Sequence, residues 1–471
     1  MQNFLIQEVP PCYSGGRSSS ESEKGMGKVI FSRRSFLNIV VPLIINQVLS
    51  VAIGMEDSIM VSSAGAAAIS GVSLVDTLNV LLVYLFTSLS AGGSVVISQL
   101  MGRGQQERAN KAAGQLVLTV FCTAALLTVG ALSFRRGLLR LLFGSIEADV
   151  MRSAGSYFLY TALAYPFMGL FSSCEAIFHA MGSPRVSMVA SAVMNVVNIG
   201  ANAIFIYLLD LGAAGAALGT LLARAAGAMV LAVLIRNRKN TLYVDSFLRL
   251  RPDLSLIGSI CRIGIPNGLE NSMFQLGRVL TQSLIATFGT AQIAANATAL
   301  SITSLQYIPG SAIGTAMIII VGRCIGAKQT QQAKKYALRL LAIAYGAIIA
   351  LSAVILLFRA PIVSSYNLTG ESFDLACWLL VYHSICVCTI WPLAFTLPNS
   401  FRAASDVKFT MVLSIFSMWA FRIGLSYFIS YRFHLGIMSV WYAMAADWTF
   451  RAVVFTVHFF RGAWLTKYRD I

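Results

Sequence analysis

The sequence predicts an all-α membrane protein in which twelve transmembrane helices form two pseudo-symmetric six-helix lobes. Three observations support this fold class: an apolar composition, a series of long apolar segments, and an internal repeat. Of the 471 residues, 57% are hydrophobic and only 11% are charged, and the mean hydropathy is +0.74. Soluble domains contain about 25% charged residues, so the composition excludes a water-soluble protein.

Polar residues, glycines and prolines divide the chain into apolar segments, and about 20 such residues suffice to cross a bilayer. Spans are expected at residues 36–62, 70–98, 113–134, 152–177, 185–209, 213–235, 257–287, 292–321, 337–358, 374–401, 408–431 and 436–460. A chain with this pattern is expected to be a multi-pass protein of the cell (plasma) membrane.

The residues before the first span include SGGRSSSESEKGMG, which is rich in Ser and Gly and typical of disorder. The apolar run that follows is too long for the core of a cleavable signal peptide, which has about 7–15 residues. Translation is expected to start at either Met1 or Met26, because MGKVIFSRRSF leads directly into the first span.

The basic residues indicate the orientation of the spans, because Lys and Arg concentrate in cytoplasmic loops. With the N-terminus in the cytoplasm, cytoplasmic segments hold 25 of the 35 Lys and Arg residues and external loops hold 6. Both termini are therefore expected in the cytoplasm. The same bias explains the net charge of +16, so the charge does not indicate a nucleic-acid partner.

An internal repeat appears when the sequence is compared with itself at a shift of 224 residues. GRGQQERANKAA at 102–113 then meets GAKQTQQAKKYA at 326–337, and at a shift of 223 FHAMGS at 178–183 meets FRAASD at 401–406. The order is kept through six spans, which indicates a duplication. Because six is even, both halves insert with the same orientation, and a substrate path is expected at their interface.

The repeat and one long charged connection divide the chain into five parts. They are expected to be a disordered cytoplasmic N-terminus (1–32), an N-lobe (33–236), a cytoplasmic linker (237–255), a C-lobe (256–462) and a cytoplasmic tail (463–471).

Two acidic residues, Glu56 and Asp57, lie side by side in the first expected span. A charge at the centre of a transmembrane helix costs about 2.5–3.5 kcal/mol on insertion scales, so each one needs a reason. Neighbours on a helix diverge by about 100°, so only one of the two side chains can face a narrow cavity.

The fifth span carries three amides, Asn195, Asn198 and Asn202, at a spacing that places them on one helix face. Thr220 follows in the sixth span, among small residues that allow close helix packing. Carboxylate, amide and hydroxyl oxygens suit a hard cation such as Na⁺, and a proton could compete for the same carboxylate. The alternative is that the amides only connect helices through hydrogen bonds.

The first span of the second half also contains polar residues. Glu270, Gln275 and Arg278 lie within about two turns of one another and form a candidate site for the second lobe.

The last two spans contain charges for which a structural role is expected. Asp447 and Arg451 are an i, i+4 pair in the order that favours a helix salt bridge, and Arg422 could join them. His179 and His383 are interpreted as hydrogen-bonded polar groups without a catalytic role.

The sequence shows no pattern typical of an enzyme or a metal protein. The eight cysteines have no metal-ligand spacing with histidines, and they are interpreted as small apolar fillers. HxxxD, Ser-His-Asp and Gly-rich phosphate motifs are absent from the sequence, which weighs against a membrane enzyme or an ATP-driven pump. No cofactor is expected, and the coupling ion, H⁺ or Na⁺ at Asp57, is the one ion considered.

From about residue 33 to 465, the chain resembles the multidrug and toxic compound extrusion (MATE) family. The matching stretches are EDSIMVSSAGAAAISGVS, SQLMGRGQQERANKAAG, RIGIPNGLENSMFQLGRVLTQSLIATFGTAQIAANA and GIMSVWYAMAADWTFRAVVF. The resemblance implies two six-helix lobes that form a V and export organic, often cationic, compounds in exchange for Na⁺ or H⁺. It implies that Asp57 is the coupling residue, and that Asn198 and Thr220 belong to a cation site in the N-lobe.

The chain departs from the family pattern at several positions. One subgroup has Asp where Asn202 stands, so this chain has one charge fewer for Na⁺ coordination. Glu270 matches the second-lobe acid only loosely, one turn early, and no acid matches around Trp391. The Arg of the motif that ends the fourth span is His179 here, whereas Arg402 keeps it in the second half.

The leading functional hypothesis is a monomeric, cation-coupled antiporter that exports organic, cationic drugs or metabolites. The alternative is a flippase for lipid-linked compounds or oligosaccharides of the same superfamily. A flippase should line its cavity with several Arg or Lys for phosphate, whereas the in-span basic residues of this chain are few. A membrane-embedded transferase is the least favoured class, because no catalytic constellation is visible.

The charge bias predicts the topology. A reporter fused after Ile471 and a reporter inserted in the linker 236–255 should both give the cytoplasmic signal, because basic loops stay inside. An external signal from either fusion would contradict the twelve-span topology.

Overall fold

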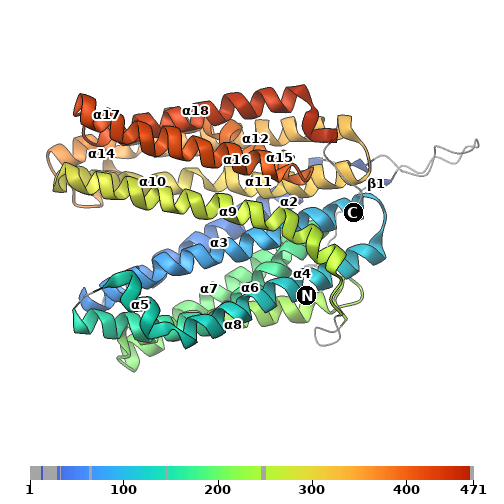
Figure 1. Ribbon diagram of the computed structural model, residues 1–471, viewed down its shortest axis with the longest axis horizontal. Coiled ribbons are helices and arrows are strands. Elements are labelled where there is room, and N and C mark those ends of the chain that lie inside the picture. The colour runs from blue at the N-terminus through green and yellow to red at the C-terminus, as the bar shows by residue number, and fades with distance from the viewer. Residues whose placement is uncertain are drawn as a thin grey trace, which may run out of the picture. The chain divides into compact units, whose positions relative to one another are not determined.

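The computed structural model describes residues 12–13, 29–31, 33–62, 66–144, 147–245 and 251–466. Contacts divide the chain into two compact units, of which the first extends to Gly268 and the second begins at Leu269. Each unit is a bundle of helices (Figure 1). Two short strands, β1 (Cys12–Tyr13) and β2 (Val29–Ile30), pair in antiparallel fashion.

The helices of the first unit follow the apolar segments of the first half. They are α2 (Arg33–Ser62), α3 (Ala66–Gly102), α4 (Gln106–Ser133), α5 (Arg135–Phe143), α6 (Ala148–Met181), α7 (Pro184–Asn202), a π-helix (Ala203–Leu208) and α8 (Gly212–Ile235). The next helix, α9 (Leu254–Ile285), begins in the first unit and ends in the second.

The second unit repeats the pattern with more interruptions. After a 3-10 segment (Ala286–Phe288), its elements are α10 (Thr290–Gln306), α11 (Ile308–Gly326), α12 (Thr330–Leu357), α13 (Arg359–Ser364), α14 (Glu371–Thr389), a π-helix (Pro392–Thr396), α15 (Pro398–Ala403), α16 (Val407–Ser417), a second π-helix (Met418–Gly424), α17 (Leu425–Phe433), α18 (Ile437–Arg461) and a last 3-10 segment (Ala463–Thr466).

The expected spans fall on these helices, and the predicted all-α membrane class is confirmed. Within the described ranges, nine helical segments are long and apolar enough to cross a membrane. The remaining expected spans lie on α6, α9 and α18, which have 34, 32 and 25 residues. The count of twelve spans stays a prediction.

Glycine and proline set the helix ends where their backbone preferences require. Gly182 ends α6 in the left-handed region, at φ 83°, a conformation that costs glycine little. Pro184 then occupies the first position of α7, where its missing N–H would have no helical partner in any case. Gly462 ends α18 in the same way, at φ 75°.

Small residues bring the helices of the first unit into close contact. Gly71 on α3 is buried, and a Cβ atom at this position would lie 2.7 Å from the backbone nitrogen of Ala154 and 3.0 Å from the carbonyl oxygen of Val150, both on α6. The backbones of α3 and α6 therefore touch at Gly71, as is typical of helix pairs in membranes.

Gly71→Ala should destabilise the protein by about 1–3 kcal/mol, because the new methyl group would force the two backbones apart. The measurement is the melting temperature of the purified protein in detergent. Gly155→Ala on α6 is the control, since a Cβ atom there would meet no neighbouring atom within 4 Å. Equal melting temperatures for the two variants would contradict the close packing of α3 on α6.

Candidate functional site

The acidic pair of the first span lies near the end of α2. Glu56 and Asp57 belong to this helix, but their side chains are outside the described part of the structure. The role expected for Asp57 therefore stays a prediction.

The amides of α7 are buried and make hydrogen bonds along and across helices. Asn195 donates through Nδ2 to the carbonyl oxygen of Leu49 on α2, at 3.3 Å, and to that of Ser191, at 2.8 Å. Asn202 donates through Nδ2 to Oδ1 of Asn198, at 3.3 Å. The expected amide row exists, and Asn195 connects α7 to α2 as the structural alternative supposed.

Helix α8 packs directly against the end of this row. A Cβ atom at Gly219 would lie 1.9 Å from Oδ1 of Asn202, so only a glycine leaves room for the amide in this arrangement. Thr220 is the next residue of α8 and is half-buried. The structure thus places Asn198, Asn202 and α8 together, while their role as ion ligands stays a prediction.

A half-buried acid that the sequence interpretation missed, Glu175 on α6, lies at the centre of a second polar group. Asn46 on α2 donates through Nδ2 to Oε1 of Glu175, at 2.6 Å, and accepts at Oδ1 from the hydroxyl of Ser191 on α7, at 2.6 Å. Arg224 on α8 attracts Glu175 electrostatically. An acid within an apolar segment is the signal that could have found it, by the same argument that singled out Asp57.

His179 was expected to be a hydrogen-bonded polar group, and the structure departs from this expectation. Its Nε2 lies 3.9 Å from Oε1 of Glu175, and this nitrogen forms no hydrogen bond with the described residues. The histidine therefore faces the acid without a direct bond in this arrangement.

Another missed group connects α3 with α6. Tyr157 donates its hydroxyl hydrogen to Oδ1 of Asp76, at 3.0 Å, and Tyr165 donates to Oδ1 of Asn79, at 2.9 Å. Asn79 in turn donates to Oδ1 of Asp76, at 3.2 Å. Asp76 is again an acid in an apolar segment, so its position in the sequence could have indicated a buried polar group.

In the second unit, Glu270 pairs with Arg402, which belongs to α15. Arg402 donates from Nη2 to Oε1 of Glu270, at 2.9 Å, and from Nη1 to Oδ1 of Asn399, at 3.0 Å. Arg278 lies against Gln275, with 3.4 Å between Nη1 and Oε1. The three residues of the candidate second-lobe site thus belong to two separate polar groups.

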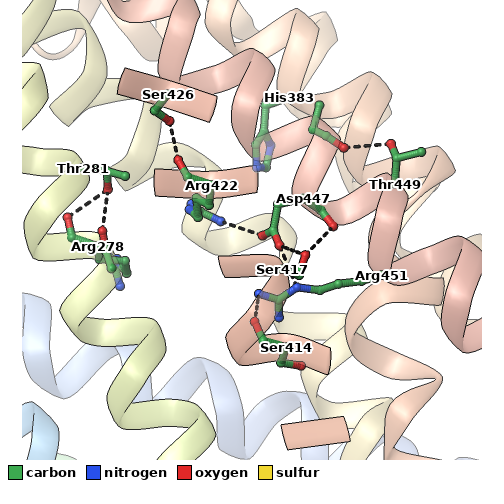
Figure 2. Close-up of polar contacts among 12 residues, drawn as sticks. Arg278, Thr281, His383, Ser414, Ser417, Arg422, Ser426, Asp447, Thr449 and Arg451 are labelled. Carbon is green, nitrogen blue, oxygen red and sulfur yellow. Dashed lines mark hydrogen bonds and ion pairs between the residues drawn. The ribbon is translucent and has the colours of Figure 1, made fainter. Parts of the chain in front are cut away.

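The charges expected to be structural do form a cluster, shown in Figure 2. Arg451 donates from Nε to Oδ1 of Asp447, at 2.8 Å, and from Nη2 to the carbonyl oxygen of Ser414, at 3.0 Å. Ser417 also donates to Oδ1 of Asp447. Arg422 is further away, with 3.8 Å between its Nη1 and Oδ2 of Asp447.

Next to this cluster, His383 is hydrogen-bonded at both ring nitrogens, as expected for a satisfied polar group. Its Nδ1 lies 2.7 Å from Oε1 of Gln306, and its Nε2 lies 2.6 Å from the hydroxyl of Tyr307. Gln306 donates onward to the hydroxyl of Ser384, at 2.8 Å. This chain of bonds connects α10 with α14.

The described residues contain no group of three or more His, Cys, Asp or Glu side chains that could hold a metal ion. In both units, the buried polar groups instead connect neighbouring helices through hydrogen bonds and ion pairs. Such groups can bind and release small ions or polar parts of a substrate, because they lie within a protein interior that is otherwise apolar.

Comparison with known proteins identifies the relatives of the chain. The MatE family model matches residues 42–204 and 266–428. The two ranges start 224 residues apart, which is the shift of the internal repeat. Among curated proteins, the uncharacterized transporter YisQ of Bacillus subtilis is 24% identical, with 92% of this chain and 95% of the relative covered. The probable multidrug resistance protein NorM of Neisseria meningitidis serogroup A is 26% identical, over 88% and 91% of the two chains.

Solved structures share the fold. The outward-facing conformation of a multidrug resistance MATE family transporter of the MOP superfamily aligns with a TM-score of 0.86 at 20% identity, and covers 92% of this chain and 96% of the other. A MATE structure in the straight conformation aligns with a TM-score of 0.84 at 21% identity, over 92% and 97% of the two chains.

The Glu270–Arg402 pair predicts a non-additive effect on stability. Glu270→Gln should destabilise the protein by about 3–5 kcal/mol, because it leaves a buried guanidinium without its acid. Glu270→Gln combined with Arg402→Gln should lose less than the single variant, since no uncompensated charge remains. Melting temperatures in detergent provide the measurement.

A matched control is Arg152→Gln, which breaks the Arg152–Asp149 pair on α6, where the side chains are 81% and 77% exposed. It should leave the melting temperature unchanged, because exposed pairs contribute little. Strictly additive losses at Glu270 and Arg402 would contradict a direct ion pair.

Proposed function

Because the chain belongs to the MatE family of membrane transporters, we propose that it is a secondary active antiporter that exports organic, cationic compounds in exchange for H⁺ or Na⁺. The observation that carries the proposal is the match of the family model to both halves of the chain. The names of relatives support the substrate class, since several are probable multidrug resistance proteins. The protein acts as a monomer in the plasma membrane, with both termini in the cytoplasm.

In the proposed mechanism, Asp57 holds either the coupling ion or the substrate cation, and never both favourably. Binding of one then requires release of the other, which connects the two fluxes. Asn198, Asn202 and Thr220 supply neutral oxygen atoms on α7 and α8 that suit a cation. The proposal is supported by the burial of both amides.

Glu175 lies at a different height along the helix bundle of the first unit from Asp57. It accepts a hydrogen bond from Asn46, which precedes Asp57 on α2 by a distance of about 16 Å along the helix axis at 1.5 Å per residue. Because residue 202 is Asn, α7 adds no second carboxylate to a Na⁺ ion at Asp57. This charge balance favours H⁺ as the coupling ion.

The test replaces the acid by a side chain of the same shape that cannot ionise. Asp57→Asn should insert and fold normally, because it removes a charge from the membrane, but efflux of a cationic dye against its gradient should fall to near background. Glu56→Gln is the matched control and should keep most of the activity, since the two side chains diverge by about 100°. Protein level and efflux are measured together in the same cells.

Full efflux by Asp57→Asn at normal expression would refute the coupling role. Loss of expression together with efflux would instead show a structural role. Efflux that collapses when Na⁺ is removed at fixed pH would refute H⁺ coupling.

A further inference from the structure

We propose that the second unit binds an organic anion at Arg422, and that the carboxylate of an aromatic substrate occupies this site. The inference rests on the proposed function, because it names a substrate class for the transporter. It starts from an imbalance of charge in the Asp447 cluster, which contains two guanidinium groups and one carboxylate (Figure 2).

Arg451 binds one oxygen of the carboxylate. Its Nε lies 2.8 Å from Oδ1 of Asp447, and its Nη2 donates to the carbonyl oxygen of Ser414. The side chains of Asp447 and Arg451 are 0% and 3% exposed, and together they form a neutral buried pair. The other carboxylate oxygen, Oδ2, forms no hydrogen bond with the described residues and is the acid oxygen nearest to Arg422.

Arg422 is left with an unbalanced charge. Its side chain is only 11% exposed, and its nearest acid oxygen is 3.8 Å away, which is too far for a hydrogen bond. Among the described residues, neither Nε nor Nη1 has a hydrogen-bond partner. Asp447 is therefore the counter-charge of two guanidinium groups, and an anion would supply Arg422 with a second negative charge and with hydrogen-bond acceptors.

A second guanidinium reinforces the positive field. Arg278 on α9 lies close enough to Arg422 for electrostatic repulsion, and its own hydrogen bond goes to a neutral amide, that of Gln275. A cationic group would be repelled by this part of the second unit. An anion would be attracted by both arginines.

One aromatic ring lies against the guanidinium of Arg422, and further rings of the second unit stack on one another. The ring centre of Phe274 is 5.2 Å from the guanidinium carbon of Arg422. Tyr307 stacks on Trp391, with 5.2 Å between ring centres, and Trp391 stacks on Phe395, with 5.3 Å. A carboxylate suits the planar fork of arginine, and an aromatic ring attached to it could pack against such neighbours.

The local backbone is consistent with a functional site. Arg422 lies within the π-helix Met418–Gly424, and π-turns inside α-helices frequently accompany functional sites. Because the proposed substrates are cationic, the inferred ligand is a compound that carries an amine as well as an aromatic carboxylate.

The experiment measures binding to the purified full-length protein in detergent by calorimetry, in a chloride-free buffer. The probe is 2-naphthoate, and 2-naphthamide serves as the neutral compound of nearly the same shape. Naphthoate should bind at least about tenfold more tightly than naphthamide, because only the former offers a charge-assisted bond. Arg422→Gln should weaken naphthoate binding by about tenfold, and it should fold, since the Asp447–Arg451 pair stays neutral.

Two further variants keep the test decisive. Arg278→Gln, at an exposed position, should weaken naphthoate binding by about threefold, since its charge is partly screened. Arg432→Gln removes another exposed arginine of the same unit and should leave binding unchanged. If Arg422→Gln did not fold, the comparison of Arg278→Gln with Arg432→Gln would decide.

Equal binding of naphthoate and naphthamide would overturn the proposal, as would unchanged binding in Arg422→Gln. Displacement of naphthoate by an equal concentration of chloride would show a site for inorganic anions and overturn the organic ligand. Binding needs no ion gradient, so failure of efflux with intact naphthoate binding would count against the proposed function alone.

Discussion

A lipid bilayer offers no water to a polar side chain, so a buried polar group in a transmembrane helix needs a partner from the protein. In the first unit, Asn46 shows how this constraint shapes the bundle. One amide donates to Glu175 and accepts from Ser191, so a single side chain connects α2, α6 and α7. Apolar packing alone leaves the rotation of each helix about its axis weakly specified, and such directional bonds fix it. The candidate ion site on α7 depends on that rotation.

The duplication kept this constraint and changed the residues that meet it. A shift of 224 residues places Asn46 on Glu270, and a shift of 223 places His179 on Arg402. In the first unit the acid lies on α6 and the amide on α2, whereas in the second the acid lies on α9 and the amide, Asn399, on α15. Each unit therefore joins equivalent helices through an acid, and the acid and the residue that donates to it have exchanged helices, while the basic residue, His179 or Arg402, keeps its position.

The exchange also changes the charge that each unit can carry. An imidazole such as that of His179 can be neutral near physiological pH, whereas the guanidinium of Arg402 is always charged. The polar group of the second unit thus always contains a positive charge. The two halves are copies in architecture and differ in their electrostatics.

The sequence predicted the helical membrane class and the positions of the spans because long apolar runs have few other solutions. It also predicted the Asp447–Arg451 pair, since i and i+4 are neighbours on any helix. It did not predict which helices would meet, because partners such as Glu175 and Asn46 are 129 residues apart. For the same reason, the sequence did not predict the pairing of Glu270 with Arg402. Glu175 and Asp76 could be recognised in the sequence as acids in apolar segments, but their hydrogen-bond partners could not.

Hydropathy did not predict the π-helices either, because an apolar segment has the same hydropathy whether it forms an α-helix or a π-helix. Helices α16 and α17 are separated by one of them, and Ser414 before it and Ser426 after it are both buried. In an uninterrupted α-helix these two serines would point about 120° apart, at about 100° per residue. One residue absorbed by the wider turn reduces the difference to about 20°. The π-turn thus works as a register correction, which aligns the polar faces of two short helices that share one axis.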